Sequence, residues 1–71
     1  MEKERFGAFI AEKRKGLGMT QKDLAERLYI TDKAISKWER GLSYPDVTLL
    51  EPLAEQFGLG VSELIACREK T

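Results

Sequence analysis

Residues 20–41, with the sequence TQKDLAERLYITDKAISKWERG, constrain the fold of this chain more than any other stretch. Thr20 and Thr31 are of the residue type that caps helix N-termini, and each precedes a run with helical spacing of apolar residues. The inner faces of the two predicted helices consist of Leu24, Ala25, Leu28, Ile35 and Trp38. We therefore predict helices over 21–28 and 32–40, with the turn between them at 29–30 and a stop at Gly41.

The outer face of the second predicted helix carries short or cationic hydrogen-bonding side chains. They are Asp32, Lys33, Ser36, Lys37 and Arg40. Lys33 and Lys37 lie four residues apart and so share one side of the helix. Such a surface suits the major groove of DNA, and the two helices then form a helix-turn-helix motif whose second helix reads the bases. The alternative is an ordinary solvated face, which the surrounding motif disfavours.

The segment before this motif predicts a first helix over 2–16. Its apolar residues have the three-, four- and seven-residue spacings of a buried stripe, which comprises Phe6, Phe9, Ile10 and, beyond the helix end, Leu17. Gly16 and Gly18 stop this helix. Gly7 lies inside it, and we interpret this glycine as the sign of a close helix crossing.

The segment after the motif predicts two more helices. Asp46 is a good N-cap for the fourth, but Pro52 falls where a helix interior is expected. Two interpretations stay open: one helix, or a turn at 47–50 followed by a helix over 51–57. Ser62 is expected to cap a last helix with Leu64 and Ile65 facing inward. The chain is thus predicted to be a single all-α domain over 1–71, a compact five-helix orthogonal bundle with residues 68–71 frayed.

The composition excludes most kinds of catalytic and metal site. The chain has no histidine and one cysteine, Cys67, which leaves no zinc or haem site, no nucleophile–histidine pair and no internal disulfide. We expect no enzymatic activity, no cofactor and no metal, and a passive thiol at Cys67. No window approaches the ~20 apolar residues of a membrane span, and the N-terminus lacks an apolar signal core, so a cytoplasmic location is predicted.

The formal net charge is zero, which is unusual for a DNA-binding domain, but the charges are unevenly distributed. Residues 1–40 hold ten Lys or Arg and seven Asp or Glu, whereas residues 41–71 hold two and five. Since the local field at the contact face governs binding, the basic half is the expected DNA side. The balance predicts weak non-specific binding.

The segments LGMTQKDLAERL, ITDKAISKWERG and YPDVTLLEPLAEQFGLGVSELI together resemble the phage-repressor and Cro-like helix-turn-helix family, also called the XRE family. The similarity extends from Phe6 to Leu64. It implies a lambda-repressor-like five-helix fold and sequence-specific binding of double-stranded DNA. It further implies a bacterial or phage transcriptional regulator, most often a repressor, that binds a roughly palindromic operator as a weak homodimer stabilised on DNA.

The resemblance also implies roles for individual residues. Gln21 and Thr31 match positions that contact phosphate, and Gln21 also supports the reading helix. The base-facing positions are matched by Asp32, Lys33 and Lys37, with Ser36 beside them. Arg40 and the loop 41–44 match a segment that contacts the DNA backbone. Arg14 and Glu39 match a partly buried ion pair that ties the first helix to the reading helix, next to the core residue Trp38.

Several features depart from the family pattern or leave alternatives open. Tyr29 stands where glycine is common, so it either takes a positive φ at a cost or bends the turn differently. Asp32 either accepts a hydrogen bond from a cytosine amino group or caps the helix locally beside Thr31. Leu42 and Tyr44 pack on the core or on a second protomer. The alternative function is a protein-interaction module of the same fold with little DNA specificity.

Overall fold

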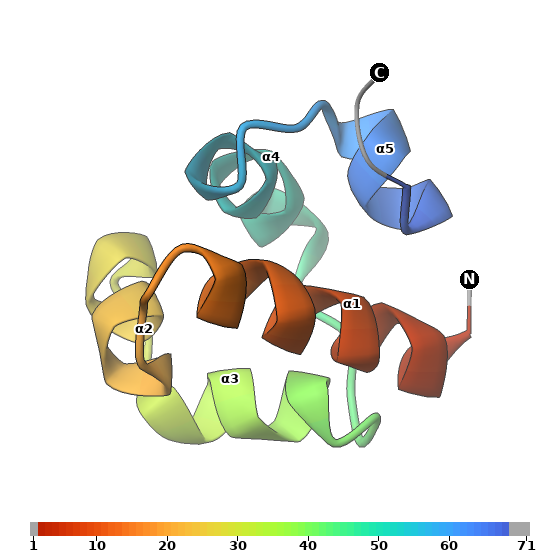
Figure 1. The fold of residues 1–71 in the computed structure, drawn as a ribbon. Coiled ribbons are helices and arrows are strands. Elements are labelled where there is room, and N and C mark those ends of the chain that lie inside the picture. The colour runs from red at the N-terminus through yellow and green to blue at the C-terminus, as the bar shows by residue number, and fades with distance from the viewer. Residues whose placement is uncertain (1, 69–71) are drawn as a thin grey trace.

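The computed structural model describes residues 2–68, which form five α-helices and no strand (Figure 1). The helices are α1 (Lys3–Gly16), α2 (Gln21–Leu28), α3 (Asp32–Glu39), α4 (Val47–Gln56) and α5 (Val61–Ala66). α1 lies alongside α3, α2 crosses at one end of this pair, and α4 and α5 lie on the other side of α1. The predicted frayed end falls outside the described range except for Arg68, whose backbone N–H donates to the carbonyl of Glu63 at 3.0 Å. The all-α, five-helix prediction is confirmed.

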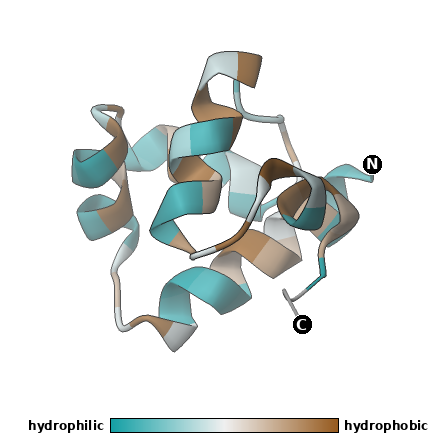
Figure 2. Ribbon diagram, turned by 90° about the horizontal axis from the view of Figure 1, so that it is seen from above, coloured by the Kyte–Doolittle hydropathy of each residue, from teal (hydrophilic) through white to brown (hydrophobic). Residues whose placement is uncertain are grey.

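Every helix contributes at least one fully buried side chain to a single core. The largest of these are Phe6, Ile10, Leu24, Ile35, Leu53 and Leu64. Figure 2 shows the pattern that makes this possible, with hydrophobic and hydrophilic stretches alternating along the helices. Trp38, at 4% exposure, completes the core from α3, as its spacing from Ile35 predicts.

The predicted N-caps are present on both helices of the motif. The Thr20 hydroxyl oxygen accepts from the Asp23 N–H, and the Asp23 carboxylate accepts from the Thr20 N–H, both at 2.9 Å, so the two residues form a capping box. The Thr31 hydroxyl oxygen accepts from the N–H of Ala34 at 3.2 Å. α3 ends one residue earlier than expected because Arg40 occupies its C-cap.

The structure decides the open question about the fourth helix in favour of one continuous helix. Asp46 caps it by accepting from the N–H of Thr48 at 2.9 Å, and the helix then runs through Pro52. Proline has no N–H, which leaves the Thr48 carbonyl without its intrahelical donor. Because Thr48 is exposed, water can satisfy that oxygen, and the helix tolerates the proline.

Three expectations about the apolar faces and caps are wrong. Leu17 is 54% exposed, because the chain turns at Gly18 (φ +72°) and places Met19 against the core in its stead. Ile65 is 40% exposed, since only Leu64 of that pair points inward from the short α5. The N-cap of α5 is Gly60 and not Ser62: the Gly60 N–H donates to the Glu63 carboxylate at 2.8 Å.

Gly7 makes the close crossing of α1 over α3 possible. A Cβ at this position would collide with the carbonyl oxygen of Trp38 and lie 2.9 Å from that of Glu39. The backbones of the two helices therefore meet directly at the last turn of α3. Because this contact fixes α3 against α1 without an intervening side chain, it confirms the interpretation of Gly7 as a crossing glycine.

Tyr29 ends α2 in the left-handed conformation, with φ +58° and ψ +41°. Glycine occupies the equivalent left-handed position after α1, α3 and α4. The tyrosine thus accepts the positive φ that glycine adopts more easily, and its side chain is 95% exposed. No helix within 2–68 combines the length and apolar character that a membrane crossing requires.

Candidate nucleic-acid interface

α3 has two chemically distinct faces, and the candidate interface is the outer one. On the inner face Ile35 and Trp38 are buried in the core. The outer face holds the exposed residues Asp32, Lys33, Lys37 and Arg40, with Ser36 half-buried between them. The structure therefore brings the predicted base-facing residues together on one accessible surface.

An ion pair between α1 and α3 holds the last turn of α3 in place. Arg14 donates to the Glu39 carboxylate through Nε at 2.6 Å and Nη2 at 2.9 Å. The two side chains are only 9% and 8% exposed. The hydrogen bond to Glu39 raises the pKa of Arg14, so the guanidinium stays charged. The ion pair that the resemblance implied is confirmed as a two-point contact.

Arg14 makes a third contact, which the sequence did not suggest. Its Nη1 donates to the backbone carbonyl of Met19 at 2.8 Å, in the connection that leads into α2. One buried guanidinium thus holds both the entry to the helix-turn-helix motif and the end of its second helix. Planar, forked donors suit arginine to this task, and lysine has no equivalent geometry.

Gln21 joins the same network from the first residue of α2. Its Nε2 donates to Glu39 Oε1 at 3.0 Å, so the Glu39 carboxylate accepts from side chains of both α1 and α2. This contact gives Gln21 a structural role beside α3. A primary amide has two N–H donors, and one remains for another acceptor.

The N-terminus of α3 is capped by Thr31 and not by Asp32. Among the residues that the structure describes, no hydrogen bond or ion pair reaches the Asp32 carboxylate. The local-capping alternative for Asp32 is therefore wrong. The exposed carboxylate stands at the first position of the helix, next to Lys33.

Arg40 folds back along α3 toward Ser36. Its Nε lies 3.2 Å from the Ser36 hydroxyl oxygen and 3.3 Å from the Ser36 carbonyl oxygen, to both of which it donates. Arg40 as a whole is exposed. Sequence reasoning placed both residues at the interface but did not foresee that one orients the other, although their spacing of four residues would have allowed it.

The two apolar side chains of the loop after α3, Leu42 and Tyr44, have different surroundings. The Tyr44 ring packs near the Phe6 ring, with the centroids 6.0 Å apart and the ring planes inclined at 60°. Leu42 is 58% exposed. Tyr44 thus contacts the core at Phe6 while remaining 38% exposed, and Leu42 is available to a partner.

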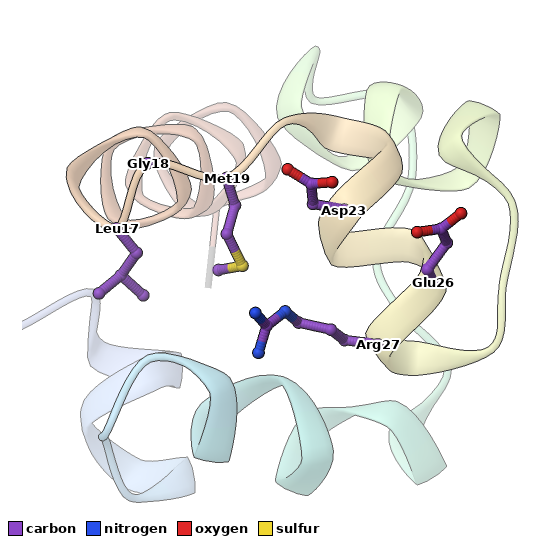
Figure 3. Close-up of a pocket in the computed structure, with 6 residues that line it drawn as sticks. All are labelled: Leu17, Gly18, Met19, Asp23, Glu26 and Arg27. Atoms are coloured by element: carbon purple, nitrogen blue, oxygen red, sulfur yellow. The ribbon is translucent and has the colours of Figure 1, made fainter.

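A surface hollow of about 460 Å³ lies on the side of α2 that faces α4 (Figure 3). Its lining residues are Leu17, Gly18, Met19, Asp23, Glu26 and Arg27. Asp23 is committed to the capping box, and Arg27 donates to Gln56 of α4 at 3.3 Å. Nowhere in residues 2–68 do three potential metal-ligating side chains converge.

The sequence model of the HTH_3 family, described as helix-turn-helix, matches residues 10–64. The chain belongs to this XRE-type helix-turn-helix family. It is 38% identical over 64 residues to the HTH-type transcriptional activator BcrR of Enterococcus faecalis, covering 90% of this chain and 31% of that protein. It is also 41% identical over 49 residues to an uncharacterized HTH-type transcriptional regulator of Methanothermobacter thermautotrophicus, covering 69% and 71%. The chain spans about a third of the length of the enterococcal relative.

Solved structures confirm the fold. The clp gene regulator ClgR of Corynebacterium glutamicum superposes with a TM-score of 0.83 at 25% identity, over 94% of this chain and 71% of that one. An HTH_3 family transcriptional regulator from Vibrio cholerae has a TM-score of 0.77 at 23% identity, over 93% and 37%. Hydroxypropylphosphonic acid epoxidase from S. wedmorenis has a TM-score of 0.78 at 23% identity, but only 34% of that chain is covered. The last two likenesses, each at 23% identity, concern the fold alone.

Proposed function

We propose that this domain binds double-stranded DNA sequence-specifically as a transcriptional regulator, or as the DNA-binding part of one, in the cytoplasm. The observation that carries the proposal is the outer face of α3, where Lys33, Lys37 and Arg40 are exposed on a helix whose inner face is fixed. An exposed helix of this kind fits the major groove of B-DNA, which admits one α-helix. Family membership supports the same function.

Each interface residue has a chemistry that matches one part of the duplex. Lys33 and Lys37 donate to base-edge acceptors such as guanine N7 and O6, or to the flanking phosphates. Gln21, at the N-terminus of α2, donates its second amide N–H to a phosphate. Thr31, at the N-terminus of α3, donates its hydroxyl hydrogen to another. Arg40, held by Ser36, presents its Nη groups to the backbone.

We further propose that two copies bind one operator as a weak homodimer. Leu42 and Ile65 are exposed apolar side chains, in the loop after α3 and in α5, and are suited to a second copy. Half-sites would then lie about 34 Å apart, one turn of the double helix. Sedimentation with and without a two-half-site duplex tests this, and a 1:1 complex on that duplex contradicts it.

Selection from a pool of random duplexes tests the DNA-binding proposal. We expect one enriched sequence, and Lys37→Ala should relax the preference at one base position. Arg40→Ala should weaken binding to all sequences. It should also reduce the slope of log affinity against log salt concentration by about one. Arg27→Ala is the matched control, because it removes one cation from the side of α2 that faces α4. Unchanged binding by both α3 variants would refute this assignment of the face.

The second candidate function is a protein-interaction module. It is favoured by the zero net charge and by the five acidic against two basic residues of 41–71. Random-pool binding at two salt concentrations separates the two candidates: no enriched sequence at either salt, together with capture of a protein partner, supports the module.

If a sequence is enriched, transcription from a promoter overlapping it should fall, because a bound dimer there blocks polymerase; a rise would make the protein an activator.

A further inference from the structure

The three aspartates of this chain do not share one role. Asp23 and Asp46 each accept a backbone N–H at a helix start, at 2.9 Å from Thr20 and from Thr48 respectively. These hydrogen bonds lower the pKa of both carboxyl groups. Asp32 also stands at a helix start, but Thr31 already caps that helix, and within residues 2–68 nothing bonds to its carboxylate.

The position of Asp32 is costly for a DNA-binding surface. It is exposed on the first turn of α3, and the N-terminal residues of a recognition helix are those that approach base edges. A carboxylate there repels phosphate, and because the net charge of the chain is zero, only the local surplus of cations in residues 1–40 offsets the repulsion.

The chemistry of the major groove determines which base such a group accepts. A carboxylate only accepts hydrogen bonds. Guanine presents two acceptors, N7 and O6, and thymine presents the O4 acceptor and a methyl group. Adenine presents its N6 donor next to an N7 acceptor. Cytosine alone presents a donor, its N4 amino group, without an acceptor of its own beside it.

We propose that Asp32 is a specificity-determining residue that selects cytosine at one position of the operator and rejects other sequences by charge. The inference rests on the proposed DNA-binding function. Lys33 and Lys37 attract the DNA backbone largely independently of sequence. Where no cytosine amino group donates to the Asp32 carboxylate, its repulsion of phosphate weakens this binding. Specificity at this position thus arises more from weakened binding to wrong sites than from tighter binding to the right one.

A structural role for Asp32 predicts a different outcome. An acidic residue in the first turn interacts favourably with the helix dipole, and this alone could account for its presence. In that case removing the charge slightly lowers stability and leaves base preference unchanged. If Asp32 acts by exclusion, removing the charge slightly lowers stability but tightens binding to random DNA.

The experiment uses the 71-residue chain and its Asp32→Asn, Asp32→Ala and Glu55→Gln variants. Glu55→Gln is the matched control, because it removes one negative charge from an exposed position on α4, a helix outside the proposed interface. Binding is measured to a random-sequence duplex and to the site that the wild type selects. Four versions of that site, differing only in the base pair whose preference the Asp32 variants change, complete the set.

We expect the wild type to require cytosine at that position, with a loss of about tenfold or more for each other base. Asp32→Asn should shift the preference to adenine, which an amide contacts through N6 and N7, and Asp32→Ala should abolish it. Both should bind random DNA about tenfold more tightly than the wild type. Glu55→Gln should change that affinity less than about twofold, since salt screens distant charges.

The outcomes separate the two proposals. If the wild type selects a site and both Asp32 variants keep the same base preference at every position, this inference is overturned and the DNA-binding function stands. An equal gain in random-DNA affinity for Glu55→Gln also overturns it, because net charge then explains the gain. Absence of any selected site for the wild type refutes the proposed function, and the inference with it.

Discussion

The inner and outer faces of α3 differ in almost every physical respect, although they belong to one helix of eight residues. Ile35 and Trp38 on the inner face are buried, and Glu39 at its end accepts from both α1 and α2. On the outer face Asp32, Lys33 and Lys37 are exposed, and no other described residue forms a hydrogen bond or ion pair with their side chains. The inner face holds the helix in place; the outer face is left to a partner.

This difference shows how a small domain divides stability from recognition. Most contacts that orient α3 come from side chains or backbone outside the proposed DNA surface. Gln21, Thr31 and the Arg40–Ser36 pair are exceptions, because they orient α3 and also belong to that surface. Substitutions on the outer face should therefore change which DNA is bound with little effect on folding. Substitutions on the inner face should do the reverse, and the following predictions test that division.

The largest effect is expected at Trp38. Trp38→Ala should lower the free energy of unfolding by about 3–5 kcal/mol, because it removes a large buried side chain and leaves a cavity under α3. Lys37→Ala, one position away on the outer face, should change it by less than about 0.5 kcal/mol. Urea titration followed by circular dichroism measures both. Similar losses for the two variants would contradict the division between the faces.

A somewhat smaller effect is expected at Arg14. Arg14→Ala should lower stability by about 3 kcal/mol, because Glu39 is left in a largely buried position with Gln21 as its remaining donor. The Arg14→Ala, Glu39→Ala double variant should recover part of that loss, since the uncompensated charge is gone. Lys15→Ala, which removes a neighbouring exposed cation, is the control. Additive losses in the double-mutant cycle would mean that the pair is not coupled.

Two glycines of α1 give the third prediction. Gly7→Ala should lower stability by about 1–3 kcal/mol, because its methyl group meets the carbonyl oxygens of Trp38 and Glu39. Gly16→Ala should raise stability by up to about 1 kcal/mol, since nothing lies within 4 Å of its added Cβ and alanine favours the helix. Thermal unfolding of the two variants should shift in opposite directions. A shift in the same direction would argue against the close crossing.

The smallest effect concerns pH. Hydrogen bonds from Thr20 and from Thr48 lower the pKa values of Asp23 and Asp46 in the folded state. A lowered folded-state pKa stabilises the protein above the unfolded value, which is near 4, and this contribution is lost as the pH falls. Urea titrations between about pH 6 and pH 3 should show this decline. The free energy of unfolding of the Asp23→Asn, Asp46→Asn double variant should decline less steeply with falling pH than that of the wild type. Equal slopes would contradict the capping role.

The sequence predicts the motif helices well because local chemistry determines them. Thr20 and Thr31 cap α2 and α3, the apolar spacing orients both helices, and Gly41 ends the motif, and each signal lies in or within a few residues of the helix it determines. The errors occur where longer-range geometry decides. Leu17 has the right spacing for the core, yet the turn at Gly18 directs Met19 there in its place.

The same reasoning explains what was missed at the interface. The pairing of Gln21 with Glu39 joins residues eighteen positions apart, and no local pattern reveals it. The contact of Arg14 with the Met19 carbonyl depends on how the chain turns after α1. The continuous α4 depends on the exposure of Thr48, which compensates for the proline, and exposure is a property of the assembled fold.

The contacts of Arg14 have a consequence for how this motif could be transferred to another protein. Residues 20–41 taken alone would carry the Glu39 carboxylate without the guanidinium that neutralises it and without the anchor on Met19. A graft that begins before α1 brings this partner along, whereas a graft of the two motif helices needs a host that supplies an arginine at the same point. The transferable unit is therefore three helices, and only its outer surface is free to be redesigned.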